Sequence, residues 1–374
     1  MPTSSALGAR NMLIQPLATL RVHTGLTEPW VLATSSIAIL WCVAAVRRKD
    51  WAASKDDQLA PKYGRSHSEC RTLRAILGAW FLENSTIVAM AVLMNRIYPP
   101  RQRRHIIITF ARSVALSMFA TEGTWIIQKF YADWLFHHLQ YFSPPERRPH
   151  SSVREFLHAW ARLFIPIRVV NGVLDARELH SLSEPEFQLL ARSPTRVGGP
   201  FSFLLQFAMA RAFHDLGFYI GHWLIHQPQL YYWIHKRHHE HHDPSVLTNN
   251  HFWIVDLLIE SGLSILGAFA ALNLFHKAGF RLGPLERTYI IYALLWYQNG
   301  AHAGKPLPCV TFFPPLSFLP CIDRVLGGGI AHHHAHHRYV KYNYGIAAWT
   351  DRVFGTCRTL ATGNEAEMSS VVHS

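Results

Sequence analysis

The stretch HWLIHQPQLYYWIHKRHHE, residues 222–240, places five histidines in two short clusters. The first cluster is the HX3H pair His222 and His226, and the second begins at His235 and ends with His239. In a helix, residues three or four positions apart lie on one face, so each cluster can direct its imidazoles to a common point. A histidine near its ordinary pKa of about 6.5 is mostly neutral at pH 7, and neutral imidazole is a good ligand for iron, zinc and copper. The stretch therefore predicts a metal site.

A third cluster lies further downstream, in the sequence HHHAHH at residues 332–337. It contains the spacing HX2HH, which the second cluster also has in HKRHH at 235–239. One HX3H pair is a weak signal, but three clusters in one chain are a strong one. Together they supply eight or nine ring nitrogens, whereas a structural zinc takes about four ligands. This number of ring nitrogens therefore indicates two metal ions rather than one. Oxygen chemistry favours iron because zinc has no redox chemistry, although the ligand type alone leaves zinc open.

The chain has 25 histidines, and not all of them are expected to bind metal. His241, His242 and His332 are interpreted as solvated extra members of the clusters, and His214 and His276 as isolated structural histidines. Glu240 does not act as the base of a zinc protease, because the sequence after His239 lacks the second histidine of an HExxH motif.

Asp215 lies seven residues before His222, two helical turns along the same face. A carboxylate in such a place can hold the outer N–H of a ligating imidazole, as carboxylates around metal sites do. An ordinary helix carboxylate explains Asp215 equally well. Trp349 and Asp351 are expected to close the fold rather than to touch substrate.

The composition indicates a membrane protein. Apolar residues make up 49% of the 374 residues and charged residues 16%, against roughly 25% charged in a soluble domain. The net charge is +12, which suits either nucleic acid or the anionic face of a bilayer. No nucleic-acid module is present, and the basic residues flank apolar segments, so the membrane interpretation is preferred.

Several apolar stretches are long enough to cross or enter a bilayer, although charged residues such as Glu83, Glu122 and Glu260 interrupt them. Charges inside a membrane normally face a bundle interior or a cavity. The stretches are 30–46, 75–95, 105–127, 199–221 and 253–275, with a shorter apolar run at 287–298. Basic residues beside the histidine clusters favour a cytosolic position for them.

These observations divide the chain into four parts. A polar N-terminal tail, either disordered or a targeting segment, precedes a membrane region that ends in an interfacial connection with an amphipathic helix around 153–165. A catalytic domain with the histidine clusters and a short C-terminal tail follow. The predicted boundaries are 1–29, 30–200, 201–357 and 358–374.

The clusters and the residues between them resemble the fatty acid hydroxylase superfamily, especially its sterol C-5 desaturase and C-4 methylsterol oxidase branch. In that branch an H-R-x-x-H box is followed, after eight residues, by H-K-x-H-H-E. Here HWLIH at 222–226 is followed, after eight residues, by HKRHHE at 235–240. The resemblance covers about 205–357.

The later motifs extend this resemblance. NHFWIVD at 250–256 is similar to the family's H-P-L-D/E element, and AHAG at 301–304 is similar to its single-histidine H-S-G element. The last cluster matches the final box, and the segment 343–356 resembles the ending N-Y-G…W-x-D-x-x-F-G-T. Trp223 replaces the usual arginine of the first box and His334 stands where aspartate is common, and groups beside ligands tune the metal.

We predict that the metal ligands are His222, His226, His235, His238, His239, His302, His333, His336 and His337, with His251 as a further candidate. Asp215 is the candidate for a carboxylate that holds the outer N–H of a ligating imidazole. The resemblance implies an all-α integral membrane protein, with a four-helix-type transmembrane base and a cytosolic histidine-rich cap that holds a dimetal centre. It also implies two iron ions, O2 as co-substrate, a location in the endoplasmic reticulum membrane, and electrons from cytochrome b5 and its NADH-dependent reductase.

The expected activity is hydroxylation or desaturation of a C–H position in a hydrophobic substrate such as a sterol, another terpenoid, a fatty acyl chain or a polyketide-like metabolite of specialised biosynthesis. The aromatic-rich run 218–233 is expected to line an apolar substrate path or to anchor the chain at the bilayer interface. A divalent-metal transporter and a non-catalytic metal-binding relative are the alternatives. Lys236 and Arg237 beside the clusters argue against a transport site at the bilayer centre.

Overall fold

The computed structural model describes residues 73–97, 106–139, 141–142, 153–181, 199–280 and 282–358. Within these ranges the chain is helical and contains no β-strand. The predicted span 30–46, the predicted tail 1–29 and nearly all of the tail 358–374 lie outside the described residues. The main α-helices are α3 (Leu73–Ile97), α4 (Ile106–Phe130), α5 (Val153–Ser181), α7 (Pro200–Ile225), α8 (Pro228–Ile234), α9 (Ile254–Lys277), α10 (Pro284–Gly300), α12 (Gly329–Tyr339) and α13 (Ala348–Phe354).

Short helical turns complete these elements. A π-helical turn, Tyr131–Leu135, follows α4, and a second, Asp323–Gly327, follows the single turn α11 (Pro320–Ile322). The remaining turns are 3-10 helices at His238–Glu240, Thr248–Asn250 and Pro314–Leu316.

Four helices fall on predicted apolar stretches: α3 on 75–95, α4 on 105–127, α7 on 199–221 and α9 on 253–275. Among the described helices, two segments are long and apolar enough to cross a membrane by length and composition, Leu73–Leu93 and Ile254–Lys277. The helix predicted around 153–165 extends to Ser181 and passes through Pro166. Its buried face continues at Arg168, which pairs with Glu122 of α4 at 3.3 Å, so packing against α4 outweighs the backbone hydrogen bond that a proline removes.

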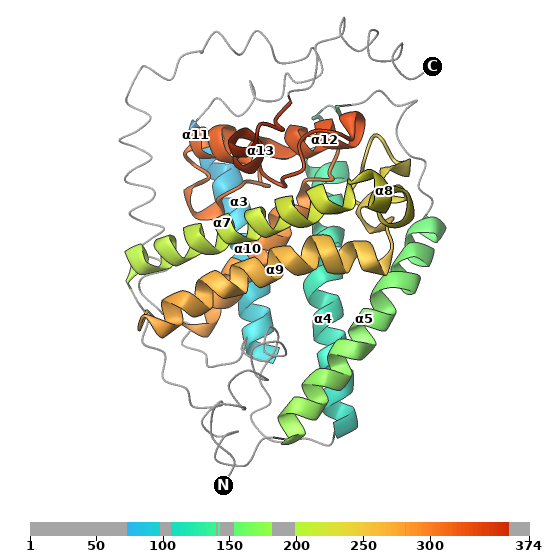
Figure 1. The fold of residues 1–374 in the computed structure, drawn as a ribbon. Helices are drawn as coiled ribbons and strands as arrows, with labels where there is room; N and C mark the ends of the chain where they lie inside the picture. The colour runs from blue at the N-terminus through green and yellow to red at the C-terminus, as the bar shows by residue number, and fades with distance from the viewer. Residues whose placement is uncertain are drawn as a thin grey trace, which may run out of the picture.

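Glycines bring α7 and α9 unusually close together. A Cβ added to Gly217 would lie 2.4 Å from the carbonyl oxygen of Leu263, and one added to Gly267 would lie 2.3 Å from that of Phe213. No larger residue fits such an approach, and small residues allow two helix backbones to pack directly on one another. Figure 1 shows α7 and α9 side by side across the middle of the molecule.

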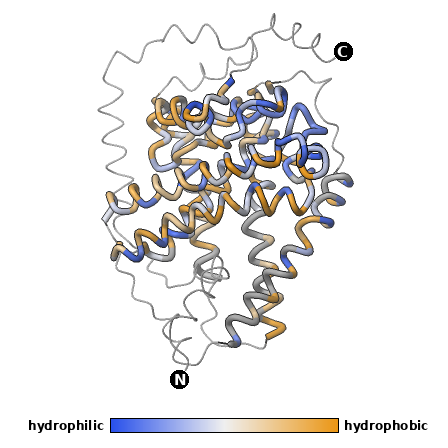
Figure 2. Tube along the Cα trace, in the orientation of Figure 1, coloured by the Kyte–Doolittle hydropathy of each residue, from blue (hydrophilic) through white to orange (hydrophobic). Residues whose placement is uncertain are grey.

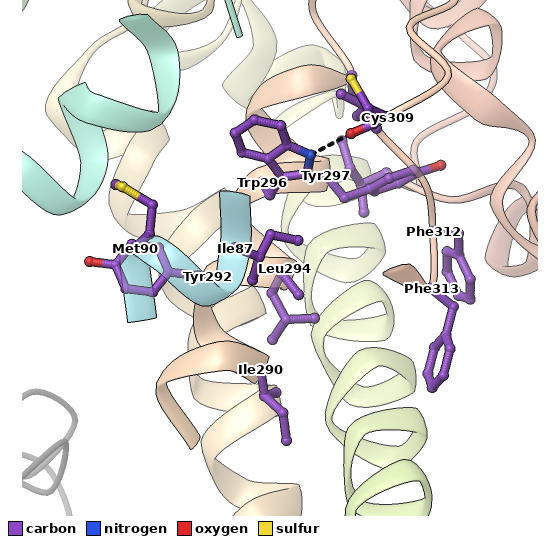
Figure 3. Close-up of a cluster of buried hydrophobic side chains, with 14 of the residues drawn as sticks. Ile87, Met90, Ile290, Tyr292, Leu294, Trp296, Tyr297, Cys309, Phe312 and Phe313 are labelled. Atoms are coloured by element: carbon purple, nitrogen blue, oxygen red, sulfur yellow. Dashed lines mark hydrogen bonds between the residues drawn. The ribbon is translucent and has the colours of Figure 1, made fainter. Parts of the chain in front are cut away.

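An aromatic core lies between α10, α3 and the segment that follows α10 (Figure 3). Trp296 is buried and its Nε1 donates a hydrogen bond to the carbonyl oxygen of Cys309 at 2.8 Å. Glu83 of α3 accepts hydrogen bonds from both the backbone N–H and the hydroxyl of Thr311, at 2.7 and 2.6 Å. These bonds satisfy polar groups that would be costly to bury alone, and they fix α10 and the segment beyond it against α3.

The crossing of α7 and α9 separates the molecule into two sides. The short helices α11, α12 and α13 lie on one side of this pair, whereas α3 and α4 run past the pair and extend, with α5, toward the other side (Figure 1). Hydrophilic residues gather around α8 and the loop that follows it (Figure 2). The histidine-bearing segments therefore meet at one end of the helical body.

Candidate metal centre

Helix ends and short turns carry the histidines. His222 lies in the last turn of α7 and His226 directly follows that helix, while His235 directly follows α8. A 3-10 turn holds His238 and His239. The last cluster lies on α12, where every residue of the stretch 332–337 is buried. Rigid helix ends thus aim imidazoles from distant parts of the chain at one region.

Five of the histidines form one group, the five-histidine group, which consists of His222, His226, His235, His239 and His336. Four of their Nε2 atoms form a closed ring of short contacts. His222 to His235 is 3.0 Å, His235 to His239 is 3.1 Å, His239 to His226 is 3.2 Å and His226 to His222 is 3.3 Å. Nε2 of His336 lies 3.1 Å from that of His239.

The other four form a second group, the four-histidine group, which consists of His238, His302, His333 and His337. His302 follows α10 and its Nε2 lies 2.9 Å from that of His333 and 3.3 Å from that of His238. In each of the two groups, the ligand atoms all lie within 4.8 Å of one another. The structure thus brings together nine of the ten predicted ligands and divides them between two positions.

Hydrogen bonds on the outer ring nitrogens orient part of this constellation. Nδ1 of His222 donates to the carbonyl oxygen of Tyr344 and Nδ1 of His336 donates to that of Tyr342, both at 2.6 Å. Nδ1 of His235 donates to Oδ2 of Asp256 at 2.8 Å. An imidazole that donates through Nδ1 keeps the lone pair on Nε2, so these rings present ligand atoms to the centre of their group.

Burial keeps these imidazoles neutral. It lowers the pKa of His302 to about 3 and the pKa of His336 to about 4. Burial, together with the neighbouring histidines, also lowers the pKa of His238 and His333 well below the usual value. A neutral imidazole is the form that binds a metal ion.

The donor set fits a pair of metal ions. Five Nε2 atoms that converge on one point cannot all be satisfied by hydrogen bonds to one another, because each neutral nitrogen is either a donor or an acceptor. Nε2 of His337, in the other group, is buried without a hydrogen-bond partner among the described residues. Two nitrogens that bind one ion at about 2.1 Å and at right angles lie about 3.0 Å apart, close to the contacts of 3.0 to 3.3 Å between Nε2 atoms of the five-histidine group. A cation in each group satisfies the inward nitrogens.

Two predicted residues lie outside both groups. His251 donates a hydrogen bond from Nε2 to Oε2 of Glu240 at 2.7 Å, and its side chain is 25% exposed. Asp215 is buried and pairs with Arg211 at 3.3 Å, and it accepts a hydrogen bond from Nε1 of Trp349 at 3.1 Å. Both side chains are held by other partners, so neither meets the converging nitrogens.

The histidines interpreted as extra or structural members have other contacts. His332 is buried rather than solvated as expected, and its Nε2 donates to Oδ2 of Asp351 at 3.0 Å. Asp351 also accepts the backbone N–H groups of Tyr344 and Gly345, both at 2.7 Å. These bonds tie α13 to α12 and to the segment at Tyr344 that orients His222, as expected for a residue that closes the fold.

Two carboxylates near the five-histidine group were not assigned from the sequence. Asp256 holds His235, and Oε2 of Glu260 lies 3.8 Å from Nε2 of His222. They lie four residues apart in α9, on one face of the helix. Charges inside an apolar helix commonly mark a functional interior, and this signal, with the i, i+4 spacing, was available in the sequence.

These features define an α-helical protein with two histidine groups that can each hold a metal ion, and a family comparison agrees with them. The family model for fatty acid hydroxylase matches residues 207–356, a segment that contains every histidine of both groups. The segment 207–356 thus matches the fatty acid hydroxylase family. No curated protein and no solved structure matches the chain.

Proposed function

We propose that this protein is a membrane-bound di-iron oxygenase that uses O2 to hydroxylate or desaturate a C–H position of a hydrophobic, lipid-like substrate. The observation that carries the proposal is the convergence of nine imidazoles into a five-histidine and a four-histidine group. The family match adds an oxidoreductase class, and the apolar helices support membrane residence.

The five-histidine group would hold one iron and the four-histidine group the other. When bound, the pair supplies redox chemistry with O2 that can remove hydrogen from an unactivated C–H bond. The chain's own part is to hold the inward nitrogens in place and to exclude water. His222, His235 and His336 are fully buried, and a dry site protects reactive species from side reactions.

The aromatic-rich run 218–233 has both buried and exposed side chains, and the buried ones indicate what kind of substrate the site can accept. Phe218 is buried, and its ring lies against His222 of one group and His333 of the other, with centroids 5.1 and 6.4 Å apart. Tyr232 and Trp233 are exposed. Phe218 is the apolar wall next to both metal positions, which suits a hydrocarbon substrate, while exposed Tyr and Trp suit an anchor at the bilayer interface.

The substrate class is a sterol, another terpenoid, a fatty acyl chain or a polyketide-like metabolite. Cytochrome b5 and its NADH-dependent reductase are the proposed electron donors, and the endoplasmic reticulum membrane is the proposed location, with the histidine groups on the cytosolic side. Exposed Lys236 and Lys341 near the clusters favour this side.

Elemental analysis of the purified protein beside a His235→Ala, His239→Ala double variant tests the proposal. About two irons per chain are expected in the parent, with clearly less in the variant, because the substitutions remove two donors from the five-histidine group. Turnover of candidate lipids with cytochrome b5, its reductase and NADH then separates hydroxylation from desaturation. Parent protein without metal after growth in iron-rich medium would contradict the oxygenase, and freely exchanging zinc would indicate transport.

A further inference from the structure

Glu260 faces the five-histidine group from α9. Its Oε2 lies 3.8 Å from Nε2 of His222, and the side chain is only 14% exposed. A carboxylate oxygen of Glu260 also lies within 4.8 Å of a ring nitrogen of His235. Glu260 accepts no hydrogen bond from any residue in the described ranges. A sheltered carboxylate without hydrogen-bond donors is costly unless a cation accompanies it.

The close crossing of α7 and α9 determines where this carboxylate lies. A Cβ added to Gly221 would be 2.8 Å from the carbonyl oxygen of Ile259 and 3.3 Å from Cα of Glu260. The backbone of α9 at Glu260 therefore packs directly against the residue that precedes His222. The proximity of Glu260 to the histidines comes from the helix packing rather than from the chance orientation of a mobile surface side chain.

The distance is compatible with one shared ion. Donor atoms bound to zinc lie about 2.1 Å from it, so two donors of the same ion are at most about 4.2 Å apart. The 3.8 Å between Oε2 of Glu260 and Nε2 of His222 falls within this limit. Glu260 can therefore reach an ion bound by His222 without movement of α9.

The neighbouring carboxylate has a different position. Asp256 accepts a hydrogen bond from the outer nitrogen Nδ1 of His235 at 2.8 Å, which makes it a positioning residue for that ring. Glu260 instead approaches Nε2 of His222, the nitrogen directed into the group. The two carboxylates thus lie one helical turn apart but on the outer and inner sides of the imidazoles.

We propose that Glu260 is a carboxylate ligand of the ion held by the five-histidine group. The proposal rests on the proposed function, because it requires a metal ion in that group. Glu260 adds a sixth donor and a negative charge to five neutral imidazoles, whereas the four-histidine group receives neither. The centre would then be asymmetric, with one saturated position and one that keeps room for a further ligand.

Cobalt binding to the purified full-length protein in detergent tests this assignment, with Glu260→Gln compared with the matched control Asp256→Asn. Six-coordinate Co(II) absorbs weakly in the visible region, and loss of a ligand strengthens its d–d bands. Glu260→Gln should weaken the binding of one of the two ions by at least ~10-fold and intensify the visible bands. Asp256→Asn should weaken binding without changing the intensity of the bands, because it leaves the donor set intact.

A Glu260→Ala variant supplies a second measurement, independent of how well the glutamine variant folds. Added formate should restore the weak parental spectrum of the cobalt-loaded alanine variant, because formate can supply the missing carboxylate. The ligand role would be overturned if Glu260→Gln kept the parental affinity and band intensity, or if Glu260→Ala did not respond to formate. The proposed function would still stand in that case, provided that the parent bound two ions. Parent protein that binds no metal would overturn both.

Discussion

The five-histidine and the four-histidine groups differ in what holds their rings. In the five-histidine group, the outer nitrogens of His222, His235 and His336 donate to two carbonyl oxygens and a carboxylate. In the four-histidine group, Nδ1 of His238 and Nδ1 of His333 are buried without a hydrogen-bond partner among the described residues. Three rings of the five-histidine group are thus oriented by outer hydrogen bonds, although Nδ1 of His239 is buried without a partner among the described residues. In the four-histidine group, one outer bond is found in the described part of the chain, from Nδ1 of His337 to the carbonyl oxygen of His241 at 3.2 Å.

This difference has consequences for metal binding. An outer hydrogen bond fixes the tautomer and the direction of a ligating imidazole and makes its inward nitrogen more basic. The five-histidine group is therefore prepared for an ion before the ion arrives. The four-histidine group has to acquire part of its order from the ion itself, so we expect it to lose metal first when a chelator is added.

Removal of one ligand from each group should have the largest effect and should show whether the two groups are separate. We expect His239→Ala and His333→Ala each to lose about one metal ion per chain and to retain the other. Activity should fall by more than the 10–100-fold typical of a lost outer hydrogen bond. Elemental analysis after gel filtration measures the loss, and loss of both ions from either variant would show that the groups act as one site.

Acid should destabilise the metal-free protein through both groups. Burial lowers the pKa of His302 to about 3 and that of His336 to about 4, whereas an unfolded chain takes up these protons near pH 6.5. The stability from neutral imidazoles is therefore present above pH 6.5 and is lost as the pH falls toward 4. At pH 5 the loss is about 2 kcal/mol for each histidine. Tryptophan fluorescence during urea unfolding at pH 7.5 and 5 measures it, and a His302→Gln variant should lose less.

Asp256→Asn should affect one group only. The substitution weakens the hydrogen bond that orients His235, so the ion of the five-histidine group should bind 10–100-fold more weakly. The four-histidine group should keep its affinity, since the hydrogen bond of Asp256 is to His235, which is not a member of that group. Competition with a chromophoric chelator measures both affinities, and equal weakening of the two would remove the distinction between the groups.

His251→Ala should have the smallest effect. His251 lies outside both groups and donates to Glu240, whose side chain is 59% exposed. Metal content should stay at the parental value, and the free energy of unfolding should change by no more than about 0.5 kcal/mol, as for most surface substitutions. A loss of metal from this variant would show that His251 joins a group when the ion binds.

Much of the architecture could be predicted from the sequence. Apolar stretches of about 20 residues predicted helices that are found at α3, α4, α7 and α9. The amphipathic helix around 153–165 was predicted too short, because Pro166 does not interrupt its buried face. The crossing of α7 and α9 was not predicted, because it depends on contacts between residues far apart in the chain. Gly217 packs against Leu263, and Gly267 packs against Phe213.

The site, like the fold, could be predicted in part from the sequence. Spacing within the three clusters was sufficient to predict metal-binding histidines, because residues three or four apart share a helix face. The spacing could not show that each of the last two clusters serves both groups. His238 lies in the four-histidine group and its neighbour His239 in the five-histidine group, because adjacent residues on a 3-10 turn point about 120° apart.

Asp215 illustrates what spacing leaves open. Seven residues place it on the same face of α7 as His222, but two turns amount to about 10 Å along the axis, and Arg211 and Trp349 bind it there. Glu260 shows the reverse, since it is distant from the clusters in sequence and lies 3.8 Å from His222 in space.

By itself, the sequence determined the type of donor in the candidate metal centre and the helical character of this protein, because ligand type, local spacing and apolar length are properties of short segments. Only the tertiary structure decided how the imidazoles are shared between two positions and which carboxylates accompany them. Those features depend on contacts between segments far apart in the chain, and above all on the glycines that allow α7 and α9 to touch.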